Sequence, residues 1–108
     1  MATNVRQTIA ATGDGLLTKY ATGSAVTITK ARIMAVQAQS SAADGSVKIY
    51  NESDSSATAS KLVCELKFGT ADGEWTHFYV PGQGIYCDTG MYAVMANCDF
   101  LTVTGTFT

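Results

Sequence analysis

Few residues in this chain are of the kinds that carry charge or chemistry. It has one histidine, one tryptophan and one proline, and 15% of its 108 residues are charged, against about 25% in an average soluble domain. No segment approaches the roughly 20 apolar residues of a membrane-spanning helix, and residues 1–11 lack the continuous apolar centre of a signal peptide. We therefore expect a protein made in the cytosol, with no membrane partner.

The charges that are present do not favour nucleic acid as a partner. The formal net charge is −2, and lysines and arginines are scattered from Arg6 to Lys67, whereas phosphate-binding surfaces gather them. Threonine, serine, alanine and glycine take the place of charged residues. Either this is the ordinary composition of a small β protein, or copies of the chain or a partner cover much of its surface, so that solubility needs fewer charges.

Three cysteines, Cys64, Cys87 and Cys98, cannot all pair within one chain, and a cytosolic origin favours reduced thiols. Together with His77, they are residues of the types that bind zinc, and they could form a four-ligand site. Structural zinc sites usually draw ligands from close pairs, whereas here 12, 9 and 10 residues separate successive members. Each cysteine also shares a strand face with apolar residues, which favours buried free thiols and no metal.

The dominant pattern in the chain is a period of two. Near the C-terminus, Leu101, Val103 and Phe107 alternate with threonines, as in a strand with one face in the core and the other in water. We expect this strand to hold the carboxyl end in a sheet. If it lies at the edge of that sheet, its threonines meet solvent or form a seam against a neighbouring subunit.

Residues 62–68 show the same alternation, with one apolar and one largely charged face, and predict a central strand. Other strands are expected within residues 16–20, 47–50, 75–80, 85–87 and 91–96, and residues 25–39 are long enough for two strands or one bent strand. Asp-Gly pairs at 14–15, 44–45 and 72–73 predict tight hairpins. The sequence thus predicts an all-β fold, a single antiparallel β-sandwich or jelly-roll-like domain of about seven to nine strands.

The N-terminal part fits two descriptions. Val5, Gln7 and Ile9 form a short period-two pattern that predicts an edge strand. Small polar residues without large apolar anchors are equally typical of an arm that becomes ordered on contact with a partner. We assign residues 1–24 to this arm or edge strand and residues 25–108 to the β-sandwich domain.

No motif assigns a catalytic, cofactor-binding or metal-binding residue. His77 shares a strand face with Trp75 and Tyr79, and no nearby pattern supplies a nucleophile or an orienting group. The acidic residues near loops lack the dense oxygen ligands of a calcium loop, and sequence alone does not place two of them across a cleft as glycosidase carboxylates. These residues are Asp44, Glu52, Asp54, Asp72, Glu74, Asp88 and Asp99. We therefore expect no enzyme activity and no cofactor.

The aromatic residues allow two interpretations. In a domain of this size they usually belong to the core, but they could instead form a sugar-stacking platform or an interface hot spot, and tyrosine is favoured at interfaces because its ring packs while its hydroxyl stays in water. The residues concerned are Trp75, Tyr79, Tyr86, Tyr92, Tyr20 and Tyr50.

Residues 45–107 contain strands and turns in a recognisable order. The segment GSVKIYN at 45–51 is followed by a polar loop, the strand at 61–68, VPGQGI at 80–85, residues 90–94 and the closing strand at 101–107. This order resembles that of small β-sandwich virion proteins of tailed bacteriophages, over residues 25–108. The N-terminal segment has no counterpart in the resemblance, and in a decoration protein such an arm would grip the capsid.

The resemblance implies a structural protein of the virion, made in the host cytoplasm, that decorates or cements the outside of the capsid. Its expected partners are the major capsid protein and further copies of the chain, with a homotrimer favoured, and no active site is implied. The alternatives are a head-fibre, tail or receptor-binding module that binds host surface glycan through exposed tyrosines or Trp75, and an enzyme that depends on His77.

Overall fold

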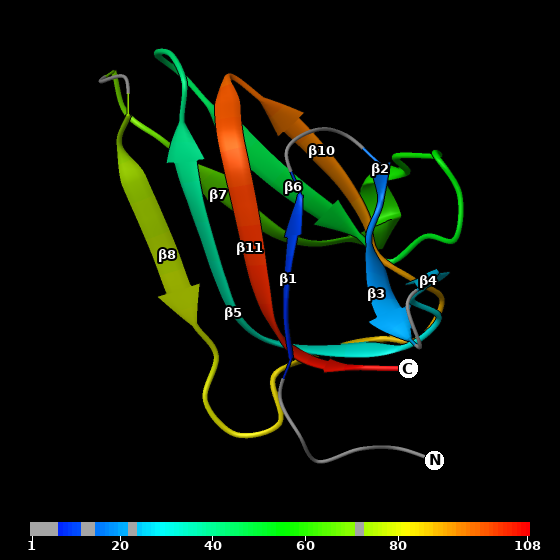
Figure 1. The fold of residues 1–108 in the computed structure, drawn as a ribbon. Helices are drawn as coiled ribbons and strands as arrows, with labels where there is room; N and C mark the ends of the chain where they lie inside the picture. The colour runs from blue at the N-terminus through cyan, green and yellow to red at the C-terminus, as the bar shows by residue number, and fades with distance from the viewer. Residues whose placement is uncertain (1–6, 12–14, 22–23, 71–72) are drawn as a thin grey trace.

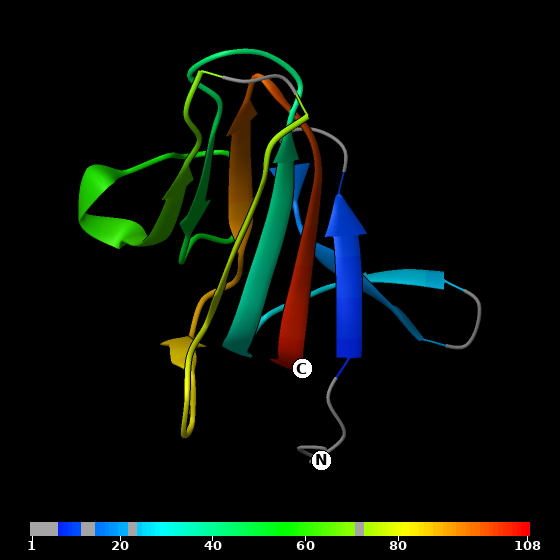
Figure 2. The same ribbon diagram turned by 90° about the vertical axis from the view of Figure 1, so that its left-hand side faces the viewer.

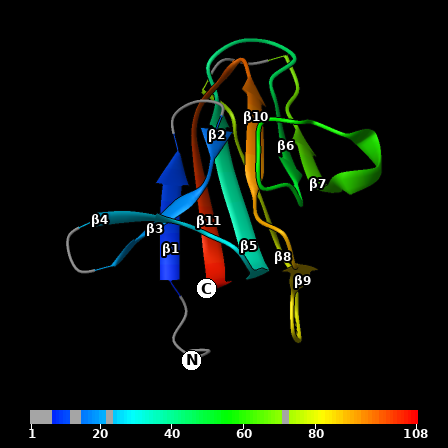
Figure 3. The same cartoon turned by 90° about the vertical axis from the view of Figure 1, so that its right-hand side faces the viewer.

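The computed structural model describes residues 7–11, 15–21, 24–70 and 73–108. Two antiparallel sheets pack face to face, and the one helical segment within these ranges is a single 3-10 turn, η1 (Ala59–Lys61). None of the described segments is therefore a helix that could cross a bilayer. Figures 2 and 3 view the two layers from opposite sides. The predicted all-β sandwich is confirmed.

The chain alternates between a five-stranded and a four-stranded sheet (Figure 1). The five-stranded sheet has the order β1 (Gln7–Ala11), β11 (Cys98–Phe107), β5 (Ala31–Ser40) and β8 (Trp75–Tyr79), with β9 (Ile85–Cys87) also paired to β5. The four-stranded sheet has the order β2 (Gly15–Leu16), β10 (Tyr92–Ala96), β6 (Ser46–Tyr50) and β7 (Leu62–Lys67). Repeated crossing between two sheets gives jelly-roll connectivity.

A separate hairpin of β3 (Thr18–Ala21) and β4 (Ser24–Thr27) projects on the side of β1, and the connection from β6 to β7, with η1, projects on the opposite side (Figures 2 and 3). Residues 25–39 thus hold parts of two strands, β4 and β5. Within the range 1–24, Gln7–Ala11 is an edge strand paired with β11, and Val5 lies outside the described residues.

The core lies between the sheets and takes one face of each strand. Leu101, Val103 and Phe107 are at most 2% exposed, which confirms their predicted place in the core. Full burial of one such side chain stabilises the fold by about 1.5–3 kcal/mol. The other strands and connections contribute Leu17, Ile28, Ile33, Val36, Ala38, Val47, Ile49, Leu66, Cys87, Met91 and Ala93.

The predicted Asp-Gly hairpins are wrong. Asp44-Gly45 joins β5 to β6, which lie in different sheets, and the connections that contain the other two pairs also pass between sheets. Asp14 and Asp72 themselves lie outside the described residues. Asp44 has a φ of 58° and Gly73 a φ of 72°, so the left-handed turn conformation is present. The turn carries the chain from one sheet to the other, because the buried faces of the two strands that it joins point towards each other.

Two strands lie elsewhere in the sheets than expected. Within the described residues, β7, predicted as a central strand, pairs only with β6 and forms an edge of the four-stranded sheet. β11 lies between β1 and β5 and is not an edge. A period of two marks a strand with one buried face but does not distinguish an edge from a centre, because both positions show the same alternation.

Asn51 fastens the turn between β9 and β10 to the end of β6. Its Oδ1 accepts hydrogen bonds from the backbone N–H groups of Thr89, at 2.8 Å, and Gly90, at 3.3 Å, and its Nδ2 donates to Oδ1 of Asp88 at 2.8 Å. Hydrogen bonds from Asn51 and then from the Thr89 hydroxyl hold the pKa of Asp88 below its ordinary value.

We expect Asn51→Ala to lower the free energy of unfolding by about 1–2 kcal/mol, because two backbone N–H groups lose their acceptor. Urea denaturation followed by circular dichroism measures the change. Thr89→Ala is the matched control, since it removes only the hydroxyl that donates to Asp88, and should cost less than about 0.5 kcal/mol. Equal costs for the two variants would contradict this role of Asn51.

Candidate functional site

The outer face of the five-stranded sheet carries exposed aromatic rings. Along β8, Trp75 is 49% and Tyr79 59% exposed, with exposed His77 between them, and Tyr86 on β9 is 48% exposed. The expected common face of Trp75, His77 and Tyr79 is thus confirmed. For Trp75, Tyr79 and Tyr86 the core interpretation is wrong. Of the remaining tyrosines, Tyr50 is buried, Tyr92 is half-buried, and the side chain of Tyr20 lies outside the described set.

Two of these rings have partners on the same face. Trp75 meets the ring of Phe100 edge-on, with centroids 5.6 Å apart and an interplanar angle of 86°. The guanidinium of Arg32 lies 4.8 Å from the centroid of the Tyr86 ring, a cation–π contact. No comparable ring contact is found for Tyr79 within the described part of the chain.

A hollow of about 260 Å³ lies beside Tyr79. We call it the aromatic hollow, and its lining side chains on the outer face are Ala35, Gln37, His77, Tyr79, Thr102 and Thr104. Strand pairing sets Gln37 between His77 and Thr102, and Ala35 between Tyr79 and Thr104. Because Ala35 has the smallest of these six side chains, the surface of the sheet is depressed at its position.

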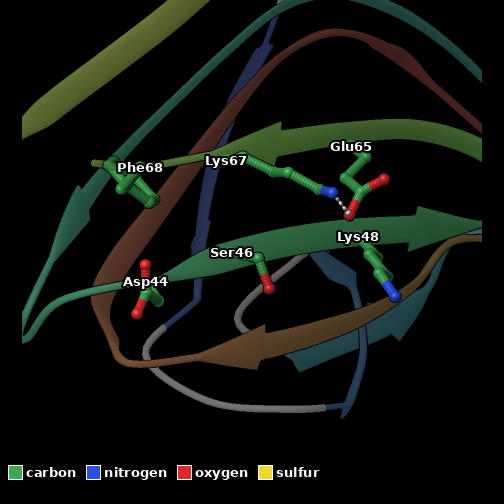
Figure 4. Close-up of a pocket in the computed structure, with 7 residues that line it drawn as sticks. Asp44, Ser46, Lys48, Glu65, Lys67 and Phe68 are labelled. Atoms are coloured by element: carbon green, nitrogen blue, oxygen red, sulfur yellow. Dashed lines mark ion pairs between the residues drawn. The ribbon is translucent and has the colours of Figure 1, made fainter. Parts of the chain in front are cut away.

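A second hollow, of about 360 Å³, lies on the outer face of the four-stranded sheet and is charged (Figure 4). We call it the charged hollow, lined by Asp44, Gly45, Ser46, Lys48, Glu65, Lys67 and Phe68. Register places Lys48 opposite Glu65 and Ser46 opposite Lys67. Lys67 Nζ lies 4.0 Å from Glu65 Oε2, with the lysine side chain 76% exposed, so this pair contributes little to stability. Its charges are therefore available to a partner.

The turn at one end of the charged hollow is rigidly held. The N–H of Asp44 donates to the carbonyl of Gly69, and the N–H of Phe68 donates to the carbonyl of Gly45, both at 3.0 Å. A Cβ on Gly45 would lie 2.5 Å from the carbonyl oxygen of Asn97. Close backbone approach therefore requires glycine here, and Asp44 is fixed in place at the rim.

The residues singled out for metal or acid–base chemistry do not come together. Cys64, Cys87 and Cys98 are free thiols, of which Cys87 is fully buried and the other two are half-buried. Within the described ranges, no group of three or more histidine, cysteine or acidic side chains is arranged to hold a metal ion. His77 instead lies opposite Gln37, in the wall of the aromatic hollow.

Several of the acidic residues have local structural partners. Asp54 accepts a hydrogen bond from the N–H of Ser56 at 2.8 Å, which lowers its pKa, and Glu74 accepts one from the N–H of Gly69 at 2.8 Å. Asp88 is bound by Asn51 and Thr89. Such contacts are typical of turn and loop stabilisation.

Both hollows were missed by reasoning from the sequence. The charged face of residues 61–67 was recognised, but its pairing with Lys48 depends on a register set after a long polar loop. The aromatic hollow depends on a small residue, Ala35, between two larger neighbours on other strands. Neither signal is local in the sequence.

No protein-family model matches the chain, and no curated protein matches it in sequence. The two surfaces described above are therefore the basis for a functional assignment.

Proposed function

We propose that the chain is a structural virion protein of a tailed phage, which decorates or cements the outside of the capsid through protein contacts and catalyses no reaction. The observation that carries the proposal is the charged hollow on the four-stranded sheet. Charges of both signs on a rigid surface give specificity for a protein partner with the opposite arrangement. Jelly-roll sandwiches also occur in viral capsid domains, which supports the proposal by analogy of fold alone.

The physical role of such a protein is to favour the closed capsid. A protein that binds only the assembled shell stabilises it by mass action, and many copies, each with a weak contact, add to a large total. The proposed partners are the major capsid protein and other copies of this chain, with a trimer favoured by the resemblance to phage decoration proteins. The proposed location is the virion, after synthesis in the host cytoplasm.

Co-sedimentation with phage heads that lack the protein tests this role. We expect the wild-type chain to bind, and the double variant Lys48→Glu with Lys67→Glu to bind about tenfold more weakly or worse, because it places like charges against the partner. The double variant Lys30→Glu with Lys61→Glu is the matched control, because it changes the net charge equally and both lysines are exposed outside the charged hollow. A wild-type chain that neither binds heads nor self-associates in analytical ultracentrifugation would refute the proposal.

The exposure of Trp75, Tyr79 and Tyr86 favours a second candidate, a head-fibre, tail or receptor-binding module that binds host surface glycan. Exposed aromatic rings of this kind stack on sugars as readily as they pack in interfaces. Electron microscopy of virions separates the two candidates. Density on the capsid faces supports the first, and density at a vertex fibre or the tail supports the second.

A further inference from the structure

We infer that the aromatic hollow is a binding site for a neutral sugar, with one pyranose ring against Tyr79 and its hydroxyl groups directed at Gln37, His77 and Thr102. The inference rests on the second candidate function in supposing that the chain meets a glycan, and it goes further by naming the site and the class of ligand.

The hollow has the dimensions of a site for one ring. Its two rows of side chains, His77–Gln37–Thr102 and Tyr79–Ala35–Thr104, each cross three neighbouring strands. Strands lie about 4.8 Å apart, so each row is about 10 Å long, and the two rows are about 7 Å apart along the strands. The depression of about 260 Å³ has Ala35, the smallest of the six side chains on the outer face, in its lining.

The Tyr79 ring supplies an apolar face. It is 59% exposed and, unlike Trp75 and Tyr86, meets no other aromatic or cationic group in the part of the chain that the structure describes. The face of an aromatic ring is the negative part of its quadrupole. The ring face therefore attracts the slightly positive C–H groups that a pyranose presents on one side.

The walls of the hollow supply hydrogen-bonding groups of both kinds. The Gln37 amide offers donors and an acceptor, and the His77 imidazole and Thr102 hydroxyl each do both. None of these three side chains forms a hydrogen bond with another described residue. Ligand hydroxyls, which also donate and accept, can satisfy all three.

The charge of the lining selects a neutral ligand. Among the described residues that line the aromatic hollow, none is aspartate, glutamate, lysine or arginine. Arg32 lies further along β5, and its guanidinium is placed over Tyr86 rather than over the hollow. An acidic sugar or a phosphate would therefore lose hydration without gaining a countercharge.

A protein partner fits the hollow less well. An aliphatic or aromatic anchor of a protein partner, inserted into the hollow, would leave the polar side chains of Gln37, His77 and Thr102 in its lining without hydrogen-bond partners, which is costly. A protein contact on this face is an outcome that the experiment below can detect.

Titration of the isotope-labelled chain with methyl glycosides of glucose, galactose, mannose and N-acetylglucosamine, followed by amide chemical shifts in NMR, tests the inference. We expect at least one glycoside to shift amides within residues 35–37, 77–79 and 102–104 in a saturable manner. A single exposed ring contact should give a Kd of about 1 mM or weaker.

Substitutions then locate the site. Tyr79→Ala removes the stacking face, and Ala35→Ile fills the hollow while keeping every polar group, so each should weaken binding about tenfold or more. Thr106→Ile places the same side chain, isoleucine, on the outer face of β11 outside the hollow, and Tyr86→Ala removes an exposed ring outside it. Both controls should leave the Kd within about twofold, because surface changes away from a site act weakly. The wild-type shift map gives the answer even where one variant fails to fold.

The inference is overturned if none of the four glycosides shifts these amides, if the shifts centre on Trp75 or Tyr86, or if Ala35→Ile binds as the wild type does. It is also overturned if Ala35→Ile abolishes binding to heads, because the face would then be a protein contact. Loss of sugar binding by Ala35→Ile with unchanged co-sedimentation supports the inference. Failure of head binding by the wild type bears only on the first proposed function.

Discussion

Replacing Gly105 with alanine is expected to destabilise the protein by about 3–5 kcal/mol, a large part of the 5–15 kcal/mol that a domain of this size usually has. Gly105 is buried at an irregularity in the pairing of β11 with β5. A Cβ there would collide with the carbonyl oxygen of Arg32 and lie 3.1 Å from its carbonyl carbon and 3.3 Å from Ile33 Cα. These are backbone atoms of the neighbouring central strand, which cannot move without loss of pairing.

Thermal unfolding followed by circular dichroism measures this effect. A loss of this size corresponds to a fall in Tm of about 15 °C or more for a chain of this length. Thr106→Val, in the next position on the same strand but on its outer face, keeps the shape of the side chain and should change Tm by less than about 4 °C. A Gly105→Ala protein with the Tm of this control would show that the two strands are not so closely packed at Gly105.

Two of the three thiols are expected to resist alkylation. Burial raises the pKa of Cys64 from 9.0 to about 12, helped by the neighbouring Cys87, and burial with the nearby Asp88 charge raises the pKa of Cys87 to about 11. The thiolate is the reactive form. Its fraction at pH 8 is therefore about a thousandfold lower for Cys64, and about a hundredfold lower for Cys87, than for an ordinary thiol.

Mass spectrometry after exposure to iodoacetamide at pH 8 gives the rate at each cysteine, with glutathione as the exposed reference and the urea-unfolded chain as the positive control. We expect Cys64 and Cys87 to react at least about a hundredfold more slowly in the folded protein than in the unfolded chain. Rates within tenfold of glutathione in a sample that remains folded would show that these thiols are not shielded.

The same two thiols make stability depend on alkaline pH. The folded protein holds their protons more tightly than the unfolded chain does, so their contribution is complete below pH 9 and is lost as pH rises through about 11 and 12. Tm should thus fall between pH 9 and 11. A Cys64→Ala variant should show a shallower fall than the wild type, which separates the thiol from tyrosines and lysines that titrate in the same range.

The alternation of apolar and polar residues predicted which segments form strands, but it did not predict which strands are neighbours in each sheet. Leu101, Val103 and Phe107 were placed in the core because a period of two needs only one strand to be recognised. The neighbours of that strand are β1 and β5, far away in sequence, and nothing local specifies them. The Asp-Gly pairs likewise predicted a left-handed turn at Asp44, but the layer to which the chain returns depends on where both buried faces point.

The candidate sites show the same limit. That Trp75, His77 and Tyr79 share a face follows from their spacing, and the structure agrees. Whether that face is buried depends on which layer covers it, and the four-stranded sheet packs on the other side of β8. The aromatic hollow exists because Ala35 lies between Tyr79 and Thr104, and this juxtaposition comes from three strands that the sequence separates by loops.

The position of β11 between β1 and β5 determines the order in which the fold can form during synthesis. β1 is made before the other strands of its sheet, yet its only strand partner in the described structure is β11, so the five-stranded sheet stays incomplete until residues 98–107 have been synthesised. Pairings between such distant segments form slowly, because a long loop must close first. Until then the edges of β1 and β5 that will receive β11 are open to pairing with other chains. Any assembly that uses the complete five-stranded sheet therefore follows the synthesis of residues 98–107.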